Sequence, residues 1–280
     1  MVDHVHNPAI FGDEKVVDLL TTISQMKVNR AQYNAWTNCI GGFMLRLGAI
    51  KFFKVLPLRL VEFDLNSLTY AQDSRSWLLV LIEKNLKIDA NLDFYVSYFL
   101  PIILQLDKMR ELEKKGRGSD IKVKKYETIL VQIWNLLPQF CMSNSPNLSD
   151  CFATLLKYIE PIISKNLLGL RNLGLKVFSS LIKHCRKTKV VDDEIKKTRK
   201  GLINISMDYV NGLVSLYTQD TEEEKQLQEM AEKESLKTGK IVKAKFYRSE
   251  GQGVILAALY DFCSITKSGK LSNLFLTSFA

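Results

Sequence analysis

The sequence predicts an all-α protein: an irregular α-solenoid of the HEAT or armadillo kind, coiled as a right-handed superhelix of helical hairpins. Apolar residues recur at three-and-four spacing in one segment after another, which is the period of an amphipathic helix. No βαβ alternation and no run of period-two strands interrupts them. Four of the six prolines lie within or next to apolar helical stretches, where they kink helices: Pro57, Pro101, Pro138 and Pro161. A compact helical bundle is the alternative architecture.

The stretch from Tyr126 to Cys141 is the clearest of the predicted helices. Its apolar side chains share one wide face, which neighbouring helices must cover: Ile129, Leu130, Ile133, Trp134, Leu137, Phe140 and Cys141. Pro138 has no N–H to donate to the carbonyl of Trp134, so we expect the last turn to bend. A bent helix with one buried face suits a curved, stacked array.

Eight other segments carry a helical stripe. They are residues 14–26, 30–47, 76–86, 91–115, 170–185, 203–217, 253–265 and 271–279. A further helix is expected to begin at Ser145 and Pro146, with the serine hydroxyl as its cap and the proline in its first turn. A short helical turn is expected over 49–55, and residues 58–73 are expected to form a long, partly packed connection.

The chain divides into three predicted parts. Residues 1–217 form HEAT-like helical repeats, and residues 251–280 continue them as a truncated array. Between them, residues 218–250 are highly charged and nearly free of large apolar side chains, so we expect an exposed insertion that is partly disordered.

Composition narrows the class of protein. Hydrophobic residues make up 46% of the chain and the formal net charge is +9, which favours polyanionic partners without choosing among them. The five cysteines form no CxxC pair, so we expect reduced, buried thiols and no zinc site. The N-terminal residues have no signal-peptide pattern, and no apolar run is long enough to span a membrane. We therefore expect an intracellular protein without a membrane partner.

Four runs carry a family resemblance: SRSWLLVLIEKNL (74–86), DFYVSYFLPIILQL (93–106), YETILVQIWNLLPQFC (126–141) and LRNLGLKVFSSLIKHC (170–185). In order and residue type they resemble helices of the eukaryotic ribosomal RNA-processing protein 12 family. The most specific part is a set of helix-core side chains: Trp134, Leu136, Leu137, Pro138, Phe140 and Cys141. The chain departs from that pattern after Leu79, where it reads VLI and the family tends to carry proline, and residues 218–250 have no clear counterpart.

The resemblance implies a segment of a longer, non-enzymatic HEAT-repeat scaffold of the nucleus and nucleolus. Such a scaffold binds pre-ribosomal particles and RNA, and it assists rRNA processing, ribosomal subunit maturation and export. The implied partners are pre-ribosomal RNA, ribosome-assembly proteins and the nuclear export machinery, with no cofactor, no metal and no small-molecule substrate. An importin-like nuclear transport receptor or protein-only adaptor solenoid is the alternative, for which binding should depend little on salt.

The residues themselves also predict no catalytic site. His184 and Cys185 are adjacent on a helix, so their side chains do not face each other as a base and nucleophile must. The short glycine-containing segments 116–119 and 238–240 lack the full phosphate-loop spacing and the strand–helix context.

Three basic clusters are the candidate RNA-contacting sites. The first cluster surrounds a predicted turn: Lys108, Arg110, Lys114, Lys115, Arg117, Lys122, Lys124 and Lys125, of which the last three are the candidates. The second cluster is Lys183, Arg186, Lys187, Lys189, Lys196, Lys197, Arg199 and Lys200, and it also loosely resembles a two-part nuclear import signal. The third cluster is Lys237, Lys240, Lys243, Lys245 and Arg248, with Lys243, Lys245 and Arg248 as candidates beside Phe246 and Tyr247. Ordinary solvated loops explain such clusters equally well.

Overall fold

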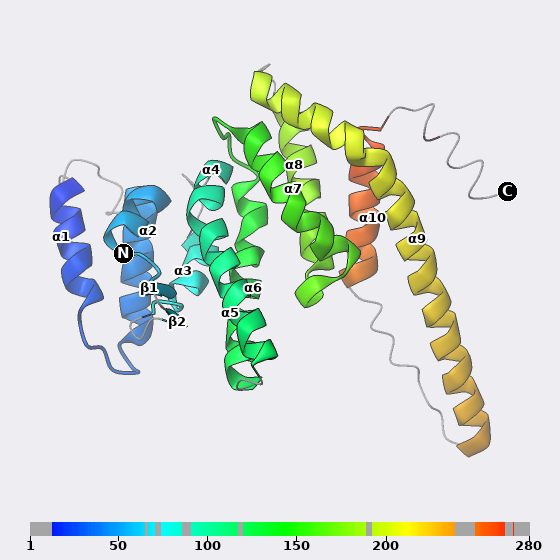
Figure 1. Ribbon diagram of the computed structural model, residues 1–280, viewed down its shortest axis with the longest axis horizontal. Helices are drawn as coiled ribbons and strands as arrows, with labels where there is room; N and C mark the ends of the chain where they lie inside the picture. The colour runs from blue at the N-terminus through cyan, green and yellow to red at the C-terminus, as the bar shows by residue number, and fades with distance from the viewer. Residues whose placement is uncertain are drawn as a thin grey trace. The chain divides into compact units, whose positions relative to one another are not determined.

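The computed structural model of the chain describes residues 13–64, 67–70, 74–85, 91–116, 120–188, 192–238, 250–266 and 271. Figure 1 shows their helices in chain order. They form two compact units, Met1–Ser145 and Pro146–Ala280. The described part is helical apart from one short hairpin of strands, and helices that are neighbours in sequence pack against each other. This arrangement confirms the predicted all-α solenoid class.

The described residues of the first unit form six α-helices, one π-helical turn and the hairpin. The elements are α1 (Asp13–Ser24), α2 (Tyr33–Val55), β1 (Val61–Asp64), β2 (Ser67–Tyr70), α3 (Leu78–Asn85), α4 (Leu92–Phe94), η2 (Tyr95–Phe99), α5 (Leu100–Lys115) and α6 (Asp120–Phe140). Helix α2 packs between α1 and α3, and α6 packs against both α3 and α5. The unit is thus a row of antiparallel-type helical neighbours with α6 near its far end.

Within its described residues, the second unit has four α-helices and one 3-10 turn. The elements are α7 (Leu148–Ser164), η3 (Leu167–Gly169), α8 (Arg171–Lys187), α9 (Asp193–Thr238) and α10 (Glu250–Cys263). Helix α8 contacts α7, α9 and α10, and α9 also contacts α7 and α10. Figure 1 shows the far end of α9 continuing away from α7 and α8.

Helix α6 contains the predicted organising stretch, and its apolar face is buried as expected. Every side chain predicted on that face is at most 5% exposed. The face packs against an aromatic group in η2, where the Tyr95 hydroxyl donates to the Ile133 carbonyl at 3.2 Å and the Phe99 and Phe140 ring centroids are 5.6 Å apart. Pro138 lies in the last turn, two residues before α6 ends. The Trp134 carbonyl therefore lacks the N–H that a residue other than proline would donate to it.

Residues 58–73 contain a hairpin of strands that the sequence did not predict. β1 and β2 pair antiparallel, with Val61 opposite Tyr70 and Asp64 opposite Ser67. Each strand is only four residues long, so neither gives a period-two pattern that stands out from a loop. The segment before the hairpin is anchored to η2, because the Leu58 N–H donates to the Tyr98 hydroxyl at 3.0 Å.

Two helix irregularities follow from single residues. Gly48 interrupts α2 with φ 74° and ψ 162°, a conformation that glycine adopts at low cost, and it separates the two predicted segments 30–47 and 49–55. Pro101 was expected to kink the interior of a helix over 91–115. The helix instead widens to the π-turn η2, and Pro101 then stands in the first turn of α5, where a missing N–H matters least.

The predicted capping role of Ser145 is wrong. Helix α7 begins at Leu148, and its N-cap residue Asn147 makes no capping bond with its side chain. The Ser145 hydroxyl accepts hydrogen bonds from the N–H groups of Leu92 at 2.7 Å and Asp93 at 3.3 Å, so it caps α4. Ser145 lies 53 positions from Leu92 in sequence, and it adds to the local cap of α4, in which the Asn91 side chain accepts from the Phe94 N–H at 2.9 Å.

The predicted insertion begins inside a helix. Helix α9 runs without a break through Thr238, so residues 218–238 continue the helix that carries the stripe over 203–217. Residues 239–249 lie outside the described residues, as does the predicted helix 271–279 apart from Leu271. The three-part division of the chain stays a prediction.

Candidate nucleic-acid interface

The second cluster lies where α8 ends and α9 begins. Lys183, Arg186 and Lys187 occupy the last turns of α8, and the other described members occupy the first two turns of α9: Lys196, Lys197, Arg199 and Lys200. All seven are exposed, whereas Lys189 lies outside the described residues. The α8–α9 packing brings the two halves of the cluster to one end of a helical hairpin.

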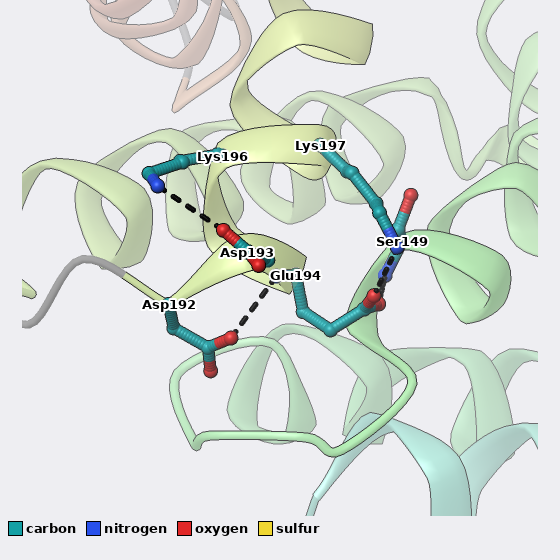
Figure 2. A network of polar contacts seen from close by, with 6 residues as sticks. All are labelled: Ser149, Asp192, Asp193, Glu194, Lys196 and Lys197. Carbon is teal, nitrogen blue, oxygen red and sulfur yellow. Dashed lines mark hydrogen bonds and ion pairs between the residues drawn. The ribbon is translucent and has the colours of Figure 1, made fainter.

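Two lysines of this cluster are paired with carboxylates of their own helix. Figure 2 shows Lys196 Nζ 3.1 Å from Asp193 Oδ1 and Lys197 Nζ 3.0 Å from Glu194 Oε1. The neighbouring Asp192 carboxylate accepts from the Glu194 N–H at 3.0 Å, which caps the start of α9. These acidic groups suit the positive end of the helix dipole, and they lower the net positive charge that the turn presents.

Glu194 also reaches a second helix. Its Oε2 accepts a hydrogen bond from the Ser149 N–H at 3.1 Å, in the first turn of α7. The hydrogen bond from Lys197, followed by that from Ser149, lowers the pKa of the Glu194 carboxyl. The same pairing raises the pKa of Lys197. Glu194 therefore supplies to α7 the acceptor that Asn147 does not.

Two other members of the second cluster hold α10 in place. Lys183 Nζ lies 3.3 Å from Oδ2 of Asp261, a carboxylate that is only 3% exposed. Arg186 Nη1 donates to the Ser264 hydroxyl at 3.1 Å. Both side chains join the end of α8 to the end of α10, so their first role is in the fold.

Three members remain available for a ligand. Lys187, Arg199 and Lys200 are exposed and form no hydrogen bond or ion pair with another side chain in the described part of the chain. The Arg199 guanidinium lies near the Cys185 thiol, but burial dominates and raises the pKa of Cys185 to about 11. Cys185 is thus a protonated core thiol at neutral pH, and it does not form the nucleophile of a His184–Cys185 pair.

Three members of the first cluster are paired with carboxylates. Arg110 pairs with Asp107 and Glu111, each at 2.8 Å. Across the α5–α6 turn, Lys114 pairs with Glu127 at 2.9 Å and Lys122 pairs with Glu113 at 3.2 Å. The exposed lysines of this turn without such a pair among the described residues are Lys108, Lys115 and Lys124. Lys125 is exposed as well, and Arg117 lies outside the described residues.

The third cluster is outside the described residues, apart from Lys237 in α9. Lys243, Lys245, Arg248 and the neighbouring aromatic pair Phe246 and Tyr247 are therefore untested as an RNA site. In the described residues, no group of three or more His, Cys, Asp and Glu side chains is placed to hold a metal ion. Within the same part of the chain, helices that are both long and apolar enough to cross a bilayer do not occur.

Sequence reasoning located the basic residues but missed the acidic ones beside them. The Asp193–Lys196 and Glu194–Lys197 pairs are three residues apart on a helix, a spacing that predicts contact, so they could have been expected. The pairs that cross between helices have no local signal. The bond from Glu194 to α7 and the pair between Lys183 and Asp261 depend on packing.

The helical hairpins and their charged ends define an α-solenoid of the HEAT-repeat class. Residues 7–234 match the family model described as "Ribosomal RNA-processing protein 12, HEAT repeats", and the chain belongs to this family. The resemblance seen in the sequence is thereby confirmed. The match includes the second cluster and most of α9.

Three curated relatives are similar to parts of the chain. An RRP12-like protein of Gallus gallus is 31% identical over 149 residues, which are 53% of this chain and 11% of the relative. A putative ribosomal RNA-processing protein 12 of Schizosaccharomyces pombe is 34% identical over 102 residues, 36% of this chain and 8% of the relative. An RRP12-like protein of Homo sapiens is 39% identical over 67 residues, 24% of this chain and 5% of the relative. The matched part of the chain thus spans about a tenth or less of each relative's length.

Proposed function

We propose that this chain is a segment of a ribosome-biogenesis factor that acts in rRNA processing. Membership of the ribosomal RNA-processing protein 12 family supports this function. We further propose a non-enzymatic scaffold of the nucleus and nucleolus that binds pre-ribosomal RNA and ribosome-assembly proteins. Subunit maturation and passage to the export machinery would follow from holding those components together.

The mechanism we propose for the RNA component is contact with phosphates by the available members of the second cluster. Lys187, Arg199 and Lys200 present positive charge at one end of the α8–α9 hairpin, and no carboxylate among the described residues is paired with them. Each phosphate neutralised by such a side chain releases a counter-ion, so affinity falls with salt. This exposed, uncompensated charge is the observation that supports the RNA proposal.

The test is fluorescence anisotropy of a labelled pre-ribosomal RNA fragment titrated with this chain across a series of salt concentrations. We expect the logarithm of the affinity to fall linearly with the logarithm of salt concentration, with a slope that counts the phosphate contacts. An absence of binding at low salt contradicts the RNA proposal, and it favours the protein-only adaptor.

Arg199→Gln/Lys200→Gln is the variant that tests whether RNA contacts the second cluster. It leaves Lys196 and Lys197 paired, so the Glu194 bond to α7 stays intact. We expect the slope of the salt series to decrease by about 1.4, since each contact with single-stranded RNA contributes about 0.7. The matched control is Lys157→Gln/Lys176→Gln, which removes the same charge from exposed positions of α7 and α8. Equal slopes for the two double variants contradict this placement.

The alternative of a protein-only adaptor is favoured by one observation. Carboxylates neutralise much of the first cluster and part of the second, which is usual for solvated turns. Binding to a partner protein with little salt dependence, together with an absence of RNA binding, is the outcome expected of this alternative.

A further inference from the structure

Helix α5 carries an exposed stripe of alternating apolar and basic side chains. The α5 stripe consists of Pro101, Leu104, Lys108, Leu112 and Lys115, spaced by three or four residues so that they share one face. Leu104 is 43% exposed and Leu112 is 55% exposed. The stripe extends over about 21 Å of helix, at 1.5 Å per residue.

The opposite face of α5 accounts for its place in the fold. Leu100, Ile103, Leu106 and Met109 are buried on that side. A helix in a packed array needs only one apolar face, and the charged side chains around the α5–α6 turn cover the flanks. The leucines of the stripe are therefore not needed for packing against the described helices.

The charge pattern of this region separates the stripe from its surroundings. Arg110, Lys114 and Lys122 point to carboxylates and are neutralised by them. Lys108 and Lys115 are exposed and form no ion pair with a described residue. The uncompensated positive charge of this face thus lies beside the two exposed leucines.

We propose that the α5 stripe binds an amphipathic helix of a partner protein whose apolar face is flanked by aspartates or glutamates. Leucines of that partner helix would contact Leu104 and Leu112, and its carboxylates would pair with Lys108 and Lys115. Apolar contact supplies affinity and the two lysines fix orientation and register. The argument rests on the complementary charge and on the one-sided exposure of leucine, and it is independent of the proposed RNA function.

Leucines at this position favour a protein partner over RNA. A phosphate backbone gains nothing from aliphatic side chains, and bases stack on aromatic rings or arginine. The stripe contains neither an aromatic side chain nor an arginine. Lys108 and Lys115 belong to the first cluster, which the sequence suggests as an RNA site. The leucines beside them make this part of the cluster better suited to binding a protein than to binding RNA.

The probe is a labelled synthetic peptide of about 16 residues with leucines on one helical face and glutamates beside them. Anisotropy measures its binding to the full chain. A peptide of the same composition in scrambled order keeps the charge and loses the apolar face. We expect the amphipathic peptide to bind and the scrambled peptide to bind at least about tenfold more weakly, the change given by the loss of roughly 1.4 kcal/mol.

Two variants locate the site. Leu104→Ser/Leu112→Ser should weaken peptide binding by about tenfold or more, whereas Leu45→Ser/Ile50→Ser, at exposed positions of α2, should not. Lys108→Glu/Lys115→Glu should weaken binding of the glutamate peptide and strengthen binding of a version that carries lysines in place of glutamates. Lys54→Glu/Lys84→Glu makes the same charge reversal at exposed positions elsewhere in the first unit and is the matched control.

Each other outcome overturns the proposal. Equal binding of the ordered and scrambled peptides means that only net charge is recognised. Loss of RNA affinity in Lys108→Glu/Lys115→Glu, with no effect of the leucine variant on any peptide, assigns the face to RNA. Self-association of the chain that Leu104→Ser/Leu112→Ser abolishes, measured by sedimentation velocity, assigns the face to a second copy.

Discussion

The turn between α7 and α8 places a leucine in the left-handed region. Leu168 has φ 55°, between Asn166 at φ 48° and Gly169 at φ 68°. Asparagine and glycine adopt this conformation at little cost, and the Asn166 side-chain Oδ1 accepts from the Arg171 N–H at 3.2 Å. Leucine gains no such bond, and its Cβ meets the following carbonyl oxygen. The turn therefore contains one residue that its backbone does not favour.

Leu168→Gly is expected to raise the free energy of unfolding by about 1 kcal/mol, because glycine relieves the left-handed strain. Leu167→Gly is the matched control. Leu167 is the preceding residue, 43% exposed, and its φ is not positive, so glycine there should destabilise the protein. Urea denaturation of both variants measures the difference. If the free energy of unfolding of Leu168→Gly is no higher than that of Leu167→Gly, the proposed backbone strain at Leu168 is contradicted.

Ser145 is a buried residue whose hydroxyl accepts hydrogen bonds from a helix that is distant in sequence. It is 5% exposed and accepts from two N–H groups at the start of α4. Ser145→Ala is expected to lower the free energy of unfolding by about 1–2 kcal/mol, because those donors lose their acceptor away from water. Ser143→Ala, two residues earlier and partly exposed, should change it little. Thermal denaturation compares them, and equal losses would show that the cap contributes nothing.

At the scale of elements, the first turn of α9 is hydrogen-bonded to the first turn of α7. Glu194 lies in α9, and its carboxylate holds the Ser149 N–H of α7 and the Lys197 ammonium together (Figure 2). Because these bonds lower the Glu194 pKa, they stabilise the fold above the ordinary pKa of 4.5. That contribution disappears as pH falls through the lowered pKa. The raised pKa of Lys197 works in the opposite sense, and its contribution is lost as pH rises through that pKa.

Glu194→Gln is therefore expected to lower the melting temperature at about pH 7 and to have no effect once the pH is below the lowered pKa of Glu194. Asp193→Asn is the control, since the Asp193–Lys196 pair stays within α9 and touches no other helix. Melting curves across a pH series test both variants. A difference between Glu194→Gln and the unmodified chain that is the same at every pH contradicts the role of the ionised carboxylate.

The elements show what sequence can and cannot predict. The buried stripes of α6 and α8 follow from local spacing, because a helix that packs in an array repeats its apolar residues every three or four positions. Ser145 and Glu194 accept from N–H groups that are 53 and 45 residues away from them in sequence. No spacing rule reaches that far. The β1–β2 hairpin was missed for a different reason, since four-residue strands are too short to show a period.

At the scale of the whole molecule, net charge and placed charge have separate consequences. The chain carries +9, which attracts any polyanion at long range. Within that field the basic residues differ in kind. Three residues of the first cluster are paired with carboxylates, and those of the second are divided among the fold, local carboxylates and solvent. The sequence predicts where the basic residues gather, but it could not distinguish these roles because most depend on which helices pack together.

The ion pair between Lys183 and Asp261 divides α8 into two zones of different availability. A polyanion that drew Lys183 to itself would leave the Asp261 carboxylate in the interior of the unit with no counter-ion, and burying a lone charge is strongly unfavourable. One helical turn further on, Lys187 is exposed and forms no ion pair with a buried carboxylate of the described residues. A ligand at this end of α8 can therefore bind Lys187 without cost to the fold. It can bind Lys183 only by breaking the ion pair that joins α8 to α10.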